Sequence, residues 1–274
     1  MTSGAPGAPP IGWADGGQVL SFGRDSWAIA ESELRKLARD PTELLTRAVQ
    51  PALWLIVFGQ VFSRIRAIPT GELTYIEFMA PGVLAQSVLF SAIFFGIAVI
   101  WERDLGIIHK LLVSPATRGA LVMGKALSAG MRGLSQAVII YVLALALGVH
   151  LRFSAGALVS VAAIVMLSSA LFATFSLIVA CLVKTRERFM GIGQVLTMPL
   201  FFASNAIYPL SLMPRWLQAV ARANPLTYVV DALRGLMVQG GHSVLGTGVD
   251  VGFQAAVFVL LVLIASRLYP GLVR

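Results

Sequence analysis

Residues 101–118 read WERDLGIIHKLLVSPATR and form a charged island between two long apolar runs. Residues 78–101, which lead into the island, contain no charged side chain. Residues 133–149 after it contain none either. A polar segment between two apolar spans must lie in water or against a soluble partner, so we place this island at a membrane face. Its apolar residues recur at helical spacing, which predicts a short amphipathic helix. They are Leu105, Ile108, Leu111 and Leu112.

The composition is that of an integral membrane protein. Apolar residues make up 57% of the 274-residue chain and charged residues only 12%, whereas a soluble domain is about a quarter charged. The single cysteine, Cys181, excludes an internal disulfide and is predicted to be a small packing residue within an apolar run. The net charge of +8 fits cationic loops beside anionic lipid, so we expect no nucleic-acid partner.

Charge-free runs of sequence predict the membrane spans. Six runs come close to the roughly 20 residues that cross a bilayer as a helix, and flanking charges can snorkel where a run is short. The predicted spans are about 41–63, 76–100, 127–149, 154–183, 189–210 and 250–268. Residues 24–274 therefore form a single all-α polytopic membrane domain. Residues 1–23 are rich in Gly, Pro and Ala, lack the features of a signal peptide and predict a disordered tail.

Lysine and arginine predict the orientation. With both termini in the cytoplasm, fifteen cationic residues fall on the inner side and six on the outer side. Cytoplasmic segments normally carry this excess, so we expect both termini inside. Because 17 of the 21 cationic residues are arginine, which suggests a GC-rich bacterial genome, we place the protein in a bacterial plasma membrane.

A further interfacial helix is predicted before the first span. Trp27, Leu34 and Leu37 recur at helical spacing opposite charged residues, as in a helix that lies on the membrane surface. A simple topology anchor is the alternative interpretation. Pro41 suits the first position of the first spanning helix, and Pro51 within that helix predicts a kink.

Residues 215–250 carry too much charge for a convincing span. Asn224 and Pro225 break this segment and predict the start of a second short helix. We therefore expect an outer re-entrant helical hairpin between spans five and six, with an ordinary amphipathic surface loop as the alternative. Asp231 and Arg234 lie three residues apart on the second helix, a spacing that favours an ion pair.

The sequence contains no convincing motif for nucleotide binding, metal binding or covalent catalysis. Residues 119–126 nearly match a phosphate-binding loop, but Ala126 replaces the Ser or Thr that holds Mg²⁺ and no strand precedes the segment. Any ATP that drives the protein must therefore bind another chain, and we expect this chain to bind no cofactor and no metal. No Asp, Glu or His lies within the charge-free runs, which argues against a proton-coupled carrier.

Two stretches resemble the type-2 ABC exporter permeases, in particular the daunorubicin-resistance-like membrane subunits. The first, residues 102–115, opens with an acidic-basic-x-x-Gly pattern and closes with Lys-Leu-x-x-Ser-Pro. The second, residues 205–234, contains NAIYPL, MPRWL, NPLTY and DALR in that order. Tyr208 stands where the family usually has Phe. The resemblance covers about residues 25–270.

The resemblance implies a dimer of six-span subunits, homomeric or heteromeric, that recruits two ABC ATP-binding subunits holding ATP and Mg²⁺. It implies a cytoplasmic coupling helix that docks on the ATPase, with the residues Glu102, Arg103, Gly106, Ile108, Lys110, Leu111, Ser114 and Pro115. It makes the helix of Trp27, Leu34 and Leu37 a connecting helix beside it. It assigns the outer re-entrant segment to Tyr208, Pro209, Pro214, Asn224, Pro225, Asp231 and Arg234.

These patterns together predict the permease subunit of an ATP-driven exporter, without enzymatic activity of its own. Its expected substrate is an amphiphilic drug, polyketide or lipid-like molecule that leaves the cytoplasm or the inner leaflet. One alternative is a self-sufficient secondary carrier or channel, which would need an ion-coupling group within the membrane. Another is a membrane-embedded enzyme, which would need a catalytic constellation. A solvated interfacial loop is the alternative interpretation of residues 102–115.

Overall fold

The computed structural model describes residues 49–65, 68–106, 118–183 and 185–268. Within these ranges every regular element is a helix, apart from one isolated antiparallel bridge between Leu151 and Val238. The all-α prediction is thereby confirmed for the described part of the chain.

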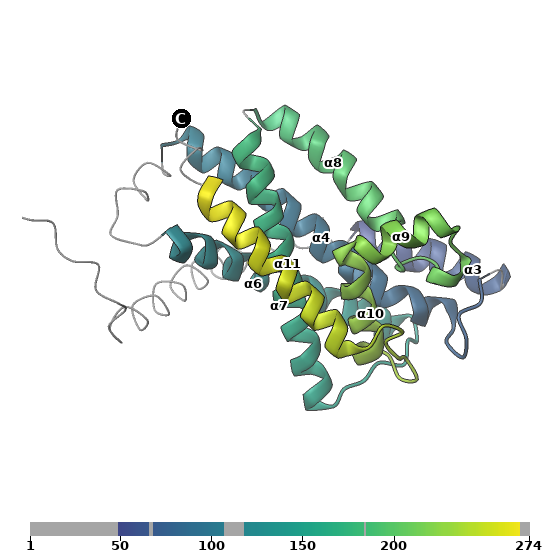
Figure 1. Ribbon diagram of the computed structural model, residues 1–274. Coiled ribbons are helices and arrows are strands. Elements are labelled where there is room, and N and C mark those ends of the chain that lie inside the picture. Colours follow the sequence, from purple (N-terminus) through teal and green to yellow (C-terminus); the bar gives the residue numbers. More distant parts are fainter. Residues whose placement is uncertain (1–48, 66–67, 107–117, 184, 269–274) are drawn as a thin grey trace, which may run out of the picture.

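Figure 1 shows the described helices in their order along the chain. They are η1 (Trp54–Gly59), α3 (Gln60–Ile65), α4 (Tyr75–Asp104), α6 (Arg118–Ala146), α7 (Ala155–Leu182), α8 (Arg186–Phe202), η2 (Leu210–Leu212), α9 (Arg215–Ala223), α10 (Pro225–Met237) and α11 (Thr247–Leu268).

Four described helices are long and apolar enough to cross a membrane: α4, the Ala126–Ala146 part of α6, α7 and α11. They coincide with the predicted second, third, fourth and sixth spans. The predicted first span, 41–63, lies only partly within the described residues, and α8 has 17 residues. The count of six spans therefore stays a prediction.

Helix α7 lies at the centre of the bundle, where it packs against α4, α6, α10 and α11 (Figure 1). Small residues allow this close packing. The Ser176 hydroxyl of α7 donates to the carbonyl of Ile93 at 2.6 Å and accepts from the amide of Gly96 at 3.1 Å. A side chain at Gly96 would collide with Ser176 and Phe189, so glycine is required where these helices meet.

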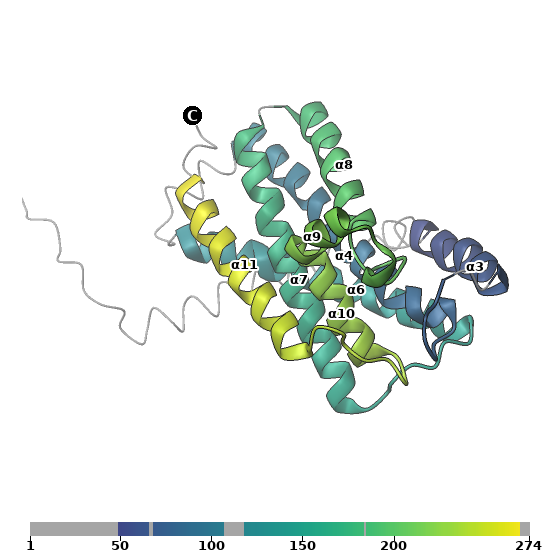
Figure 2. The ribbon, with the colours of Figure 1, turned by 45° about the vertical axis from the view of Figure 1, so that its right-hand side comes forward.

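The first described helix, which comprises residues 49–65 and includes η1 and α3, stands at the edge of the bundle, on the side away from α11 (Figures 1 and 2). The Trp54 ring packs edge-on against Phe201 at 5.5 Å between centroids, which holds this helix to the end of α8. The helix widens into the π-helical η1 three residues after Pro51. Such π-helical turns are common places for a helix to bend.

Helix α8 ends at Phe202, eight residues before the predicted end of the fifth span. Asn224 caps this end, because its side-chain amide donates to the carbonyls of Leu200 and Ala203 at 2.6 and 3.0 Å. Its side-chain oxygen accepts from the amide of Leu226 and caps α10. One residue therefore satisfies two carbonyls at the end of α8 and the first amide of α10.

Candidate functional site

The charged residues at the end of α4 hold the turn between α7 and α8. We call this region the Asp104 end of the bundle, defined by Trp101, Arg103, Asp104, Val183 and Arg186. The Arg186 guanidinium lies 2.9 Å from the Asp104 carboxylate and 3.8 Å from the centroid of the Trp101 ring. Arg103 pairs with Asp104 at 3.1 Å and donates to the carbonyl of Val183 at 3.4 Å. The entrance to the island 101–118 is therefore tied to a second pair of helices.

Gly106 follows this cluster with a positive φ of +70°. An L side chain rarely adopts this conformation, so glycine suits the sharp exit from α4. Of the predicted coupling residues, Glu102, Arg103 and Gly106 are described, and Arg103 contacts Asp104 and the carbonyl of Val183. The rest lie outside the described residues, as does the predicted connecting helix. They are Ile108, Lys110, Leu111, Ser114 and Pro115, with Trp27, Leu34 and Leu37.

The opposite end of the bundle contains a buried ion pair on α10. The Asp231 side chain is 0% exposed and that of Arg234 is 5% exposed, and the two lie 3.9 Å apart. Arg234 donates to the carbonyl of Asn205 at 2.7 Å and lies 3.8 Å over the Phe78 ring. Burial lowers the pKa of Arg234 to about 10, while the negative charge of Asp231 opposes this shift, so the guanidinium stays charged at neutral pH.

The other oxygen of Asp231 joins α10 to the chain that leads into α11. It accepts from the Ser243 hydroxyl at 2.9 Å and from the amide of Leu245 at 2.8 Å. The same hydroxyl lies 2.8 Å from the carboxylate of Asp250, at the start of α11. The predicted pair of Asp231 and Arg234 is confirmed, but its partners come from three separate stretches of chain, at Phe78, at Asn205 and at residues 243–245.

The predicted outer residues play local structural roles. Tyr208 donates to the carbonyl of Phe202, and Pro209 and Pro214 stand directly before η2 and α9. Pro225 occupies the first turn of α10 beside the capping Asn224. The two predicted short helices and the break between them are therefore confirmed, while the re-entrant position in a membrane stays a prediction.

A second set of contacts joins the helices at the same end of the bundle. The backbone amide of Arg152 donates to the carbonyl of Met237 at 2.8 Å, and the backbone amide of Gln239 donates to the carbonyl of His150 at 2.8 Å. The His150 ring contacts the Glu77 carboxylate at 2.7 Å, and Glu77 also completes a capping box with Thr74 at the start of α4. The connection between α6 and α7 therefore forms hydrogen bonds with α4 and with the end of α10.

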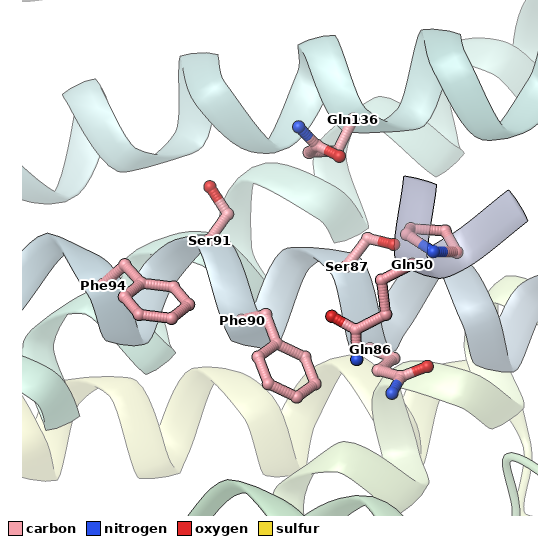
Figure 3. Close-up of a pocket in the computed structure, with 8 residues that line it drawn as sticks. Gln50, Gln86, Ser87, Phe90, Ser91, Phe94 and Gln136 are labelled. Atoms are coloured by element: carbon pink, nitrogen blue, oxygen red, sulfur yellow. The ribbon is translucent and has the colours of Figure 1, made fainter. Parts of the chain in front are cut away.

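A cavity of about 230 Å³ lies halfway along α4, between α6 and the first helix (Figure 3). Three glutamines, two serines, two phenylalanines and one proline line it: Gln50, Gln86, Gln136, Ser87, Ser91, Phe90, Phe94 and Pro51. We call it the amide cavity. The Gln86 side chain is 3% exposed, and its Nε2 has no hydrogen-bond partner within the described structure.

A second cavity of about 250 Å³ adjoins the first and shares three of its residues, Gln50, Phe90 and Phe94. Its remaining lining comes from α4 and α8 and is mostly apolar: Ile93, Ile97, Phe189, Met190, Gly193, Gln194, Thr197 and Met198. We call it the apolar cavity. No local sequence signal brings these glutamines together, because they come from helices far apart in the chain.

Comparison with known proteins agrees with the resemblance seen in the motifs. The family model described as ABC-2 type transporter matches residues 24–238. The chain belongs to the ABC-2 type transporter family. It is therefore a multi-pass membrane protein of a permease family whose members normally work with ATP-binding subunits.

Three relatives illustrate the range of this family. The chain is 32% identical to the transport permease ycf38 of Cyanophora paradoxa over 203 residues, 73% of this chain and 70% of the relative. It is 29% identical to the daunorubicin resistance ABC transporter permease protein DrrB1 of Streptomyces coeruleorubidus over 242 residues, 85% and 80% of the two chains. It is 25% identical to the inner membrane transport permease YadH of Escherichia coli K12 over 201 residues, 70% and 73%.

Proposed function

We propose that this ABC-2 permease is the membrane subunit of an ATP-driven exporter that moves an amphiphilic drug, polyketide or lipid-like molecule out of the cytoplasm or inner leaflet. One observation carries the proposal: at the Asp104 end, the start of the island forms the last turn of α4 and contacts the connection between α7 and α8. A carrier that works alone has no need for such a linkage at a cytoplasmic loop. The family relationship and the name of DrrB1 support the same choice.

The coupling follows from the contacts. A partner ATPase that closes on ATP and Mg²⁺ pushes on residues 102–115, and Gly106 allows this segment to turn against α4. Arg103 and Asp104 pass the displacement to Val183 and Arg186, so α8 moves together with α4. Because α4 and α8 both line the apolar cavity, a displacement of these two helices changes the shape of the cavity.

The assembly we propose has two permease subunits and two ATP-binding subunits, with both termini of each permease in the cytoplasm of a bacterium. The exposed apolar side chains of the first helix, such as Leu53, Val57 and Phe58, suit lipid or a second permease subunit. The hairpin of α9 and α10 then lies at the outer face, where its buried ion pair keeps it rigid beside the exit.

A pull-down from native membranes in mild detergent tests the proposal, with ATP hydrolysis measured on the eluate. We expect a P-loop ATPase to co-elute in stoichiometric amount and to be lost from the Leu111→Asp variant. Val244→Asp is the matched control, because Val244 is 67% exposed and lies in the connection before α11, at the opposite end of the bundle. This control should keep the ATPase. Transport by the purified chain alone in liposomes without ATP would contradict the proposal and favour a secondary carrier or channel.

A further inference from the structure

The amide cavity and the apolar cavity together have the form of a site for one amphiphilic molecule. Each alone is smaller than the roughly 300–1,000 Å³ of a typical small-molecule site, whereas the two combined fall within that range. They meet at Gln50, Phe90 and Phe94, so a ligand can place its polar end in one cavity and its apolar body in the other. Both Gln50 and Phe94 are exposed on the surface of the single chain, which gives the site an opening.

The polar lining is made of amides and hydroxyls. Gln86 and Gln136 are 3% and 2% exposed and lie on α4 and α6, on facing sides of the cavity. Figure 3 shows the side chains of Ser87, Ser91 and Gln136 between these two helices, while Gln86 extends from α4 and Gln50 from the first helix. The Ser87 hydroxyl donates to its own helix at Val83, which leaves its lone pairs as acceptors. A buried amide without a partner, such as Gln86 Nε2, is costly unless a ligand or water satisfies it.

The lining of the described cavities carries no formal charge. Every described residue that lines the amide cavity or the apolar cavity is neutral. Arg132 of α6 lies one turn before Gln136, and its guanidinium lies 5.5 Å from the centroid of the Phe95 ring instead of lining either cavity. Because a charge taken out of water without a counter-charge is strongly disfavoured, a charged head group does not suit this site.

We infer that these two cavities bind an uncharged amphiphile, whose hydroxyl or carbonyl groups bond to Gln50, Gln86 and Gln136 and whose apolar body lies along α8. Phe90 and Phe94 form the wall between the two halves and contact the ligand where it changes from polar to apolar. This inference rests on the proposed function, since it names the substrate class of the proposed exporter.

Photoaffinity labelling of the full-length chain in lipid nanodiscs tests the inference. Three probes share one dodecyl chain bearing a diazirine and differ only in the head group: a glucoside, a sulfonate or a trimethylammonium. We expect the glucoside probe to label the peptide of α4 that contains Phe90 and Phe94, with saturation. We expect the sulfonate and trimethylammonium probes to label it at least tenfold more weakly.

Substitution of the amides gives the second arm. Gln86→Leu and Gln136→Leu should each weaken saturable labelling by the glucoside probe about five- to tenfold, the effect of one lost hydrogen bond in a buried site. Gln254→Leu is the matched control, because Gln254 is also fully buried with an unpartnered Nε2 but lies on α11, outside both cavities. Gln86→Glu should shift preference toward the trimethylammonium probe, a gain that misfolding cannot produce.

Three results would overturn the inference: a charged probe that labels the α4 peptide as well as the glucoside, equal effects of Gln86→Leu and Gln254→Leu, or labelling that never saturates. Different results would contradict the proposed function and the inference about the ligand. If the glucoside site is confirmed but no ATPase co-purifies, the exporter proposal is wrong and the site belongs to a carrier. If a co-purified ATPase is stimulated by a charged probe alone, the exporter stands and the uncharged-ligand inference is wrong.

Discussion

Removal of the Asp231 carboxylate should destabilise the protein severely. In the Asp231→Ala variant, the Ser243 hydroxyl and the Leu245 amide lose an acceptor at 2.9 and 2.8 Å. The guanidinium of Arg234 also remains buried without its counter-charge. Breaking a buried ion pair from one side costs about 3–5 kcal/mol, so we expect the free energy of unfolding to fall by that amount.

The exposed pair at the other end of the bundle provides the matched control. The side chains of Asp104 and Arg186 are 38% and 34% exposed, and such pairs contribute at most about 1 kcal/mol. Asp104→Ala should therefore leave the unfolding free energy almost unchanged. The double variant with Asp231→Asn and Arg234→Met should recover much of the loss, because it removes both buried charges together.

Unfolding of the purified protein in mixed micelles with rising SDS content, followed by tryptophan fluorescence, measures these differences. The reasoning would be refuted if Asp231→Ala lay within about 1 kcal/mol of Asp104→Ala. That outcome would mean that water reaches the pair and screens it.

Four further predictions concern three glycines and one helix cap. A Cβ at Gly82 would lie 2.5 Å from the carbonyl oxygen of Ala206, so Gly82→Ala should cost about 1–3 kcal/mol in the same unfolding assay. Gly191→Ala meets nothing within 4 Å on helix α8 and should be neutral or stabilising by up to about 1 kcal/mol. Gly106→Val should abolish substrate-stimulated ATP hydrolysis in the complex with the ATPase. Gly106→Asn should retain most of this activity, because Asn tolerates a positive φ. Equal activity of the two variants would refute a conformational role for Gly106. Thr74→Ala should lower the unfolding free energy by about 1 kcal/mol, as loss of a helix cap does, and an unchanged midpoint would show that the cap is dispensable.

The sequence alone indicated the elements whose signals are local. An apolar run without charge can only be buried in protein or lipid, so α4, α7 and α11 lie within a few residues of their predicted positions. Asn224 followed by Pro225 likewise marked the start of α10, because capping and the fixed φ of proline act within one turn. The family motifs also follow the linear order of the chain, and the match over residues 24–238 confirmed them.

Some local signals were incomplete. The apolar run after residue 189 predicted a helix to 210, but α8 ends at Phe202, where the Asn224 side chain donates to the carbonyls of Leu200 and Ala203. Asn224 lies 24 residues beyond Leu200, so no window of sequence around the helix end contains the residue that caps it.

The tertiary structure decided what surrounds the polar side chains. Asp231 and Arg234 were predicted to pair, but their burial depends on α4 and on the chain leading into α11, which pack around them only in the fold. The amide cavity brings Gln50, Gln86 and Gln136 together from three helices. Hydrophobic periodicity indicates which face of a helix is apolar, but it does not indicate which other helix packs against that face. A binding site made across helices therefore emerges only when the bundle is packed.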